Sequence, residues 1–229
     1  MSRIIDFQEY VKQIDYIETR MKAERNKDIE MEKIQENPTD VIRRIRNDKK
    51  MKKDICRCAD AILNAFEIDA FQHYVPIVKI LNTIGIKTYK REMTTKELSA
   101  YISVDPQYYE RYGTTKIACV NREDNPRHMR FALAHELGHY IFDYDETRDI
   151  TYYNTYMKDS SEKDQTEKRA NEFAANLLMP REQFIQKKKY FEEKTNYNKP
   201  EVVVALASHF GVLTTSIQKR YLEVETPMS

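Results

Sequence analysis

A glutamate, Glu136, lies between two histidines four residues apart, His135 and His139, in the segment FALAHELGHYIF at 131–142. Residues with this spacing share one face of an α-helix, so both imidazoles can reach a single divalent cation. Glu136 then lies beside a water on that cation, where its carboxylate can accept a proton. The spacing therefore predicts metal-dependent hydrolysis, and it is the spacing that zinc peptidases use.

The residues around this motif bear on whether it is a chance match. A string of this form can arise at random in a chain of 229 residues, and its members could then be core residues with separate polar partners. The flanking residues are apolar on nearly every side, which predicts a helix buried all round. One shared cation satisfies three buried polar groups together, so we favour a metal site. Gly138 in this helix predicts that another element approaches closely there.

A tetrahedral catalytic zinc needs a third protein ligand, and two carboxylates are candidates. Asp145 follows His139 by six residues, but a chain that turns so sharply requires a glycine where this sequence has Phe142. Glu167 is the better candidate, because it shares a helical face with Asn171 one turn later. The carboxylate can bind the metal while the amide hydrogen-bonds a ligand imidazole and orients it.

Hydrophobic periodicity and turn residues predict an α+β fold that is mostly helical, with a small three-stranded, mainly antiparallel sheet beside the HExxH helix. The predicted strands are 86–90, 98–105 and 114–121. The last strand leads into the HExxH helix through Asn125 and Pro126, which cap the start of that helix. If this strand is an edge, it could hold an extended peptide by strand addition.

Two segments together, AHELGHYIF and EKRANEFAANLLMP, resemble the ImmA/IrrE family of intracellular metallo-endopeptidases. The resemblance covers about residues 75–229, while the first seventy residues depart from that layout. It implies that the metal ligands are His135, His139 and Glu167, that Glu136 is the catalytic residue, and that Asn171 supports a ligand. It also implies cleavage of a specific protein, a cytosolic transcriptional repressor often of the helix-turn-helix type and often encoded on a phage or mobile element.

The remaining patterns predict how the chain is divided. Helices are expected over 5–36 and 41–66, and the polar segment 143–166 is expected to be a loop that could act as a rim or lid. We divide the chain into a helical N-terminal extension at 1–70, a zincin-like metallopeptidase domain at 71–195 and a helix-turn-helix-like C-terminal segment at 196–229.

The ligand types also bear on the cofactor. Zinc is expected for two histidines and a glutamate, and Mn²⁺ or Fe²⁺ would fit if further waters bind. The sequence does not single out the group that stabilises the oxyanion. Donors of suitable type are Tyr112, His128, Tyr152, Tyr153 and Tyr156, but with 16 tyrosines in the chain most of them are expected to serve packing.

Two basic features raise the alternative of DNA binding. A run of lysines and arginines lies between Arg43 and Arg57, and such a run is more often a solvated helix face than a nucleic-acid patch. The C-terminal segment has a glycine between two helical patterns, as a helix-turn-helix does. Its second helix offers only Lys219 and Arg220 as strong phosphate contacts, so DNA binding is the weaker interpretation.

Composition narrows the class of protein. With 38 Lys and Arg against 37 Asp and Glu, the net charge of +1 argues neither for nor against a polyanionic partner. The sequence has no signal peptide and no apolar run long enough to span a membrane, and its three cysteines lack metal-finger spacing. We expect a soluble cytoplasmic protein. Two alternatives stay open: a non-proteolytic DNA-binding regulator, and a binding module whose metal is structural, although such a site has no use for Glu136.

Overall fold

A computed structural model describes residues 36–69, 74–93, 98–144 and 160–225, which from Asn37 onward belong to one compact unit. The helix predicted over 5–36 lies outside the described residues, except for its last residue. The helices are, in chain order, α2 (Pro38–Asn47), the short 3-10 helix η1 (Met51–Lys53), α3 (Ile55–Ala65), α4 (Ile77–Thr83), α5 (Tyr108–Tyr112), α6 (Pro126–Phe142), α7 (Ser160–Leu178), α8 (Arg181–Lys194), α9 (Lys199–Phe210) and α10 (Thr214–Glu225). The strands are β1 (Ile86–Arg91), β2 (Ala100–Val104) and β3 (Lys116–Asn121).

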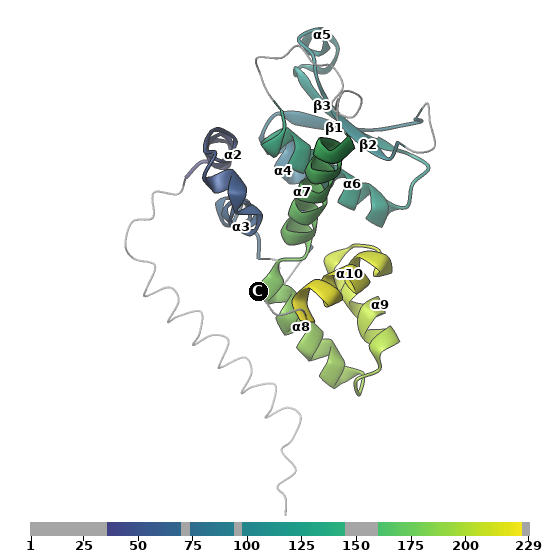
Figure 1. Ribbon diagram of the computed structural model, residues 1–229. Helices are drawn as coiled ribbons and strands as arrows, with labels where there is room; N and C mark the ends of the chain where they lie inside the picture. Colours follow the sequence, from purple (N-terminus) through teal and green to yellow (C-terminus); the bar gives the residue numbers. More distant parts are fainter. Residues whose placement is uncertain (1–35, 70–73, 94–97, 145–159, 226–229) are drawn as a thin grey trace, which may run out of the picture. The chain divides into compact units, whose positions relative to one another are not determined.

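The three strands form one sheet in the order β1-β3-β2, beside α6 (Figure 1). This confirms the predicted α+β fold with a small sheet at the HExxH helix. The sheet is mixed: β2 pairs antiparallel with β3, whereas β1 pairs parallel with it. Successive strands along the chain point in alternating directions, so β1 and β3 share a direction. In the sheet, β3 lies between the other two strands.

The position of β3 corrects one expectation about the site. The strand that leads into the HExxH helix is central rather than an edge, and its residues from Ile117 to Asn121 are all buried. The edge strand that packs against α6 is β2. The start of α6 is as predicted, since the side chain of Asn125 accepts a hydrogen bond from the backbone N–H of Arg127 and Pro126 occupies the first turn.

The helix predicted over 41–66 is broken into α2, η1 and α3. The cause is Asp48, whose Oδ1 accepts hydrogen bonds from the backbone N–H groups of Lys50 at 2.8 Å and Met51 at 3.0 Å. An aspartate that bonds the backbone in this way stabilises a turn in place of a continuous helix. Asp54 then caps the start of α3. The prediction of one continuous helix was wrong because it weighed apolar spacing alone.

Part of the basic run faces the protein. The guanidinium of Arg46 donates to the hydroxyl of Tyr140 at 3.0 Å, and the ammonium of Lys52 donates to the carbonyl of Phe142 at 3.4 Å. Both acceptors lie in the last turn of α6. The other cations of the run are exposed: Arg43, Arg44, Lys49, Lys50, Lys53 and Arg57. Helices α2 and α3 thus pack against the HExxH helix and α7, while the predicted division of the chain into three parts stays a prediction.

Helices α6 and α7 pack closely at Gly138 of α6. A Cβ atom at this position would lie 3.1 Å from the Cα of Ala170 in α7, inside the usual contact distance. This confirms the predicted close approach at Gly138. The side chains of Phe142 and Phe173 meet edge to face along the same pair of helices, with ring centroids 5.4 Å apart. Helices α6 and α7 are therefore held in close contact along their length.

The C-terminal segment forms the expected pair of helices, α9 and α10, joined at Gly211, which has a left-handed backbone. The two helices meet at 105°. No single helix among the described residues is long and apolar enough to cross a membrane, although this bent pair passes by length and composition. Arg130 of α6 donates to the carbonyl of Gly211 at 3.0 Å and so ties the pair to the HExxH helix.

Arg220 has a structural position in α10. The residue is 4% exposed, and its guanidinium donates to the side-chain oxygen of Asn176 at 2.8 Å and to the carbonyl of Met179 at 2.9 Å. It therefore satisfies acceptors at the end of α7. Arg220 is therefore not available as one of the two possible phosphate contacts of α10, because its donors are engaged inside the protein. Lys219 is exposed.

We expect Arg220→Met to lower the free energy of unfolding by about 3 kcal/mol, because it leaves buried acceptors at the end of α7 without a donor. Lys219→Met is the matched control at the neighbouring exposed position, and we expect it to change stability by less than about 0.5 kcal/mol. Denaturant unfolding of both variants measures the difference. Equal stabilities would show that Arg220 does not hold α10 to α7.

Candidate metal centre

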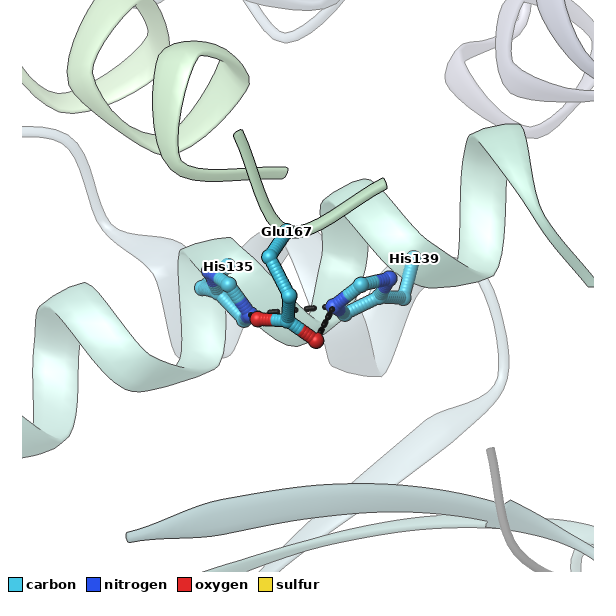
Figure 2. Close-up of side chains that lie close together, drawn as sticks. All are labelled: His135, His139 and Glu167. Carbon is cyan, nitrogen blue, oxygen red and sulfur yellow. Dashed lines mark hydrogen bonds and ion pairs between the residues drawn. The ribbon is translucent and has the colours of Figure 1, made fainter. Parts of the chain in front are cut away.

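Three predicted ligands converge between α6 and α7 (Figure 2). The Nε2 atoms of His135 and His139 lie 3.0 Å apart. The carboxylate of Glu167 lies 3.2 Å from Nε2 of His135 through one oxygen and 3.4 Å from Nε2 of His139 through the other. The structure thus brings together two residues of one helix and a third from a helix later in the chain.

The spacing of these atoms fits a metal ion. A tetrahedral ion with bonds of about 2.0–2.1 Å separates its ligand atoms by about 3.3 Å. The two Nε2 atoms lie 3.0 Å apart, and each lies 3.2 or 3.4 Å from a different carboxylate oxygen of Glu167. One donor atom from each of the three residues lies within 4.8 Å of the other two. Two imidazole nitrogens and a carboxylate are also the donor types that zinc and similar ions take. The His135, His139 and Glu167 cluster could therefore hold a divalent cation.

Asn171 lies where it was predicted to act. Nδ1 of His135 donates a hydrogen bond to its side-chain oxygen at 3.1 Å. A proton held on Nδ1 leaves Nε2, which lies on the side of Glu167, as the nitrogen that can bind a metal. Asn171 follows Glu167 by one helical turn, so a single face of α7 supplies both a candidate ligand and the group that orients another.

His139 is oriented by a residue that sequence reasoning missed. Nδ1 of His139 donates to the carboxylate of Asp143 at 2.8 Å, and the guanidinium of Arg169 also contacts this carboxylate. The Asp143 side chain is 6% exposed. The signal in the sequence was the spacing, because Asp143 lies one helical turn after His139. The pairing with Arg169 depends on the packing of α7 and had no local signal.

Glu136 is almost fully buried between its two histidines and the sheet, with 4% exposure. Its carboxylate accepts a hydrogen bond from the backbone N–H of Ile102 in β2. Burial raises the pKa of Glu136 to about 7, with a further contribution from the charge of Glu167. A carboxyl group with a pKa near neutrality can both accept and return a proton at physiological pH, as a general acid–base residue must.

The other ionisable groups of the cluster are shifted by one another. Burial lowers the pKa of His139, but its hydrogen bonds to Asp143 and Glu167 outweigh burial and raise that pKa to about 9. Hydrogen bonds from the two histidines hold the pKa of Glu167 well below its usual range. Without a cation the cluster therefore holds a proton on His139 and a negative charge on Glu167, and a bound metal would replace that proton.

The remaining site candidates are not joined to this cluster by a described contact. Tyr112 accepts from Arg91, and His128 hydrogen-bonds Ser99 at 2.8 Å. Neither has a hydrogen bond or ion pair with a predicted ligand among the described residues. The others lie outside the described residues: Asp145, Tyr152, Tyr153 and Tyr156. The oxyanion donor therefore stays open. The loop predicted over 143–166 was wrong at its end, because residues 160–166 belong to α7. Residues 145–159 lie outside the described residues, so a lid role for them stays a prediction.

We expect Asp143→Asn to weaken metal binding by about 10- to 100-fold, because an amide holds the Nδ1 proton of His139 less strongly than a carboxylate does. Titration of the metal-stripped protein with Zn²⁺ against a competing chelator measures the affinity. Asp164→Asn is the matched control, since Asp164 is exposed on α7 and pairs with Lys168. An affinity of Asp143→Asn equal to that of this control would contradict the orienting role.

The pKa of His139 predicts a pH dependence for the metal-stripped protein. An unfolded histidine has a pKa of about 6.5, so between pH 6.5 and 9 the folded state binds more protons than the unfolded state. The stabilisation is complete below pH 6.5 and is lost as the pH rises to 9, by about 3 kcal/mol. Denaturant unfolding across this range measures it. The loss of stability with rising pH should be smaller in Asp143→Asn. A free energy of unfolding that rises from pH 6.5 to 9 would contradict the prediction.

Comparison with known proteins bears on the whole arrangement. Residues 82–222 match the Peptidase_M78 family, described as an IrrE N-terminal-like domain. A search of curated proteins finds no match. The matched residues include all three strands and both helices of the candidate metal centre. The match spans more than half of the 229 residues, and it agrees with the resemblance of AHELGHYIF and EKRANEFAANLLMP to ImmA/IrrE sequences. The chain therefore belongs to the Peptidase_M78 family of IrrE N-terminal-like metallopeptidases.

Proposed function

We propose that this protein is a zinc-dependent endopeptidase of the cytoplasm that cleaves one specific protein, a transcriptional repressor of the helix-turn-helix type. The observation that carries the proposal is the convergence of His135, His139 and Glu167 beside the buried carboxylate of Glu136. Family membership supports peptidase chemistry. The repressor substrate, and an anti-repressor role on a phage or mobile element, rest on the resemblance to ImmA/IrrE proteins.

In the proposed reaction, His135, His139 and Glu167 would hold the cation, with Asn171 and Asp143 fixing the two imidazoles. A bound zinc supplies Lewis acidity, which polarises the scissile carbonyl and makes water more acidic. Glu136 accepts the proton of the attacking water and later donates a proton to the departing amine. Its burial excludes bulk water and keeps its pKa near 7, so that both transfers are accessible.

The sheet supplies a place for the substrate backbone. The edge strand β2 lies against α6, and the N–H of Ile102 reaches the carboxylate of Glu136. A peptide that adds to the free edge of β2 in extended form would pass directly beside this carboxylate. The position of β2 supports binding of an unfolded or flexible segment of the substrate protein, because a helix cannot pair with a strand edge.

The alternative of a non-proteolytic regulator with a structural metal has less support. A structural site does not require a carboxylate buried beside its ligands, as Glu136 is. DNA binding by α10 would rely on Lys219, since Arg220 is buried, and the face of α10 that carries Lys219 also carries Glu223, one helical turn later. A carboxylate on this face repels phosphate groups.

We expect Glu136→Gln to keep the metal and to lower the rate of cleavage by at least about 10²- to 10⁴-fold, because an amide cannot accept the proton of water. Co-expression with the repressor encoded next to it, followed by loss of intact repressor, measures the activity. Glu110→Gln is the matched control at an exposed position of α5. Bound zinc is measured in both purified variants. Cleavage by Glu136→Gln at the rate of the control would rule out the proposed mechanism.

A further inference from the structure

A cavity of about 750 Å³ lies beside the metal centre, between α7 and α10. Its volume falls within the range of roughly 300–1,000 Å³ that is typical of ligand sites. Part of its lining is apolar and comes from three elements or their connections: Phe131 of α6, Ala175 of α7, Met179 after α7 and Leu213 before α10. Asn171, which contacts the metal candidate His135, lines the same cavity.

The cavity continues the cleft that holds the candidate metal ligands. Asn171, one turn after Glu167 on α7, lies against His135. One turn farther along both helices, the cavity is lined by Phe131 and Ala175. The cavity therefore extends from the metal centre on the side of His135.

The C-terminal helix pair is fixed in place as a wall of this cavity. Arg130 holds the carbonyl of Gly211 at the turn between α9 and α10, and Arg220 holds the carbonyl of Met179 at 2.9 Å. These contacts place Thr215 and Lys219, on one face of α10, along the cavity. Lys219, the cation on which DNA binding by α10 would rely, thus lines the cavity.

The length of the cavity can be compared with that of an extended peptide. Asn171 and Met179 follow Glu167 by about 6 Å and 18 Å along the axis of α7, at 1.5 Å per residue. An extended chain advances about 3.3 Å per residue. A substrate chain that leaves the edge of β2 at the metal and follows α7 would therefore reach the cavity with its second to fifth residues, counted from the scissile bond.

We infer that this cavity is the specificity site of the enzyme, and that it receives large apolar side chains of the protein substrate, two to five residues from the scissile bond. The inference rests on the proposed peptidase function and names what that function leaves open, the part of the substrate that is recognised. The side chains of Phe131, Ala175, Met179 and Leu213 supply apolar contact, and α10 closes the site from the side opposite α7.

The test uses the full-length, zinc-loaded protein and a randomised peptide library whose cleaved members are sequenced. Ala175→Tyr fills the cavity from α7 and Thr215→Tyr fills it from α10, where the exposed threonine tolerates a larger side chain without disturbing the core. Ser208→Tyr is the matched control, because Ser208 is exposed on α9 and does not line the cavity. Thermal unfolding verifies that each variant is folded.

We expect wild-type cleavage to favour large apolar residues at two to five positions on one side of the cleaved bond. Either filling variant should lower kcat/KM for such peptides by about tenfold or more and leave peptides with glycine or alanine in that window unaffected. If the wild type cleaves without this preference, or if both filled variants keep it, the inference is wrong while the peptidase function stands. An equal loss of kcat/KM for these peptides in Ser208→Tyr would also overturn the inference. A wild type that cleaves no peptide would overturn both the proposed function and the inference.

Discussion

The contact between α6 and α7 is the constraint on which the rest of the structure depends. Gly138 allows the backbone of Ala170 to come so close that a Cβ atom at Gly138 would lie only 3.1 Å from the Cα of Ala170. This approach brings Glu167 opposite the imidazoles of His135 and His139, whose own spacing is set by the turn of α6. The candidate metal centre is therefore a product of helix packing, and without the close contact the motif in α6 would lack its third ligand.

The same contact surrounds the ligands with groups that orient them. The two histidines donate their Nδ1 protons in opposite directions, to Asn171 on α7 and to Asp143 just after α6. Glu136 is enclosed between these residues and β2. Buried polar groups are costly unless each has a partner, and here the partners come from three separate parts of the chain. Such a network holds its members in one arrangement, as a catalytic site requires.

Elements outside the α6–α7 pair are attached to both ends of it. Arg46 and Lys52, before and after the break at Asp48, contact the last turn of α6. At the other end, Arg130 and Arg220 attach the C-terminal helices. Arginines used in this way satisfy helix carbonyls with several donors at once. A segment that resembles a DNA reader is thereby held as a wall of the cavity next to the site.

The sequence by itself determined what depends on the geometry of a single helix. The spacing of His135 and His139, the shared face of Glu167 and Asn171, the cap at Asn125 and the α+β class all follow from periodicity that a short segment carries. Only the tertiary structure decided the rest: the parallel pairing of β1 with β3, the central place of β3, the contact of Asp143 with Arg169 and the burial of Arg220. Each of these joins residues far apart in the chain. Their pairing depends on which surfaces remain open after the helices pack, and no local pattern records that.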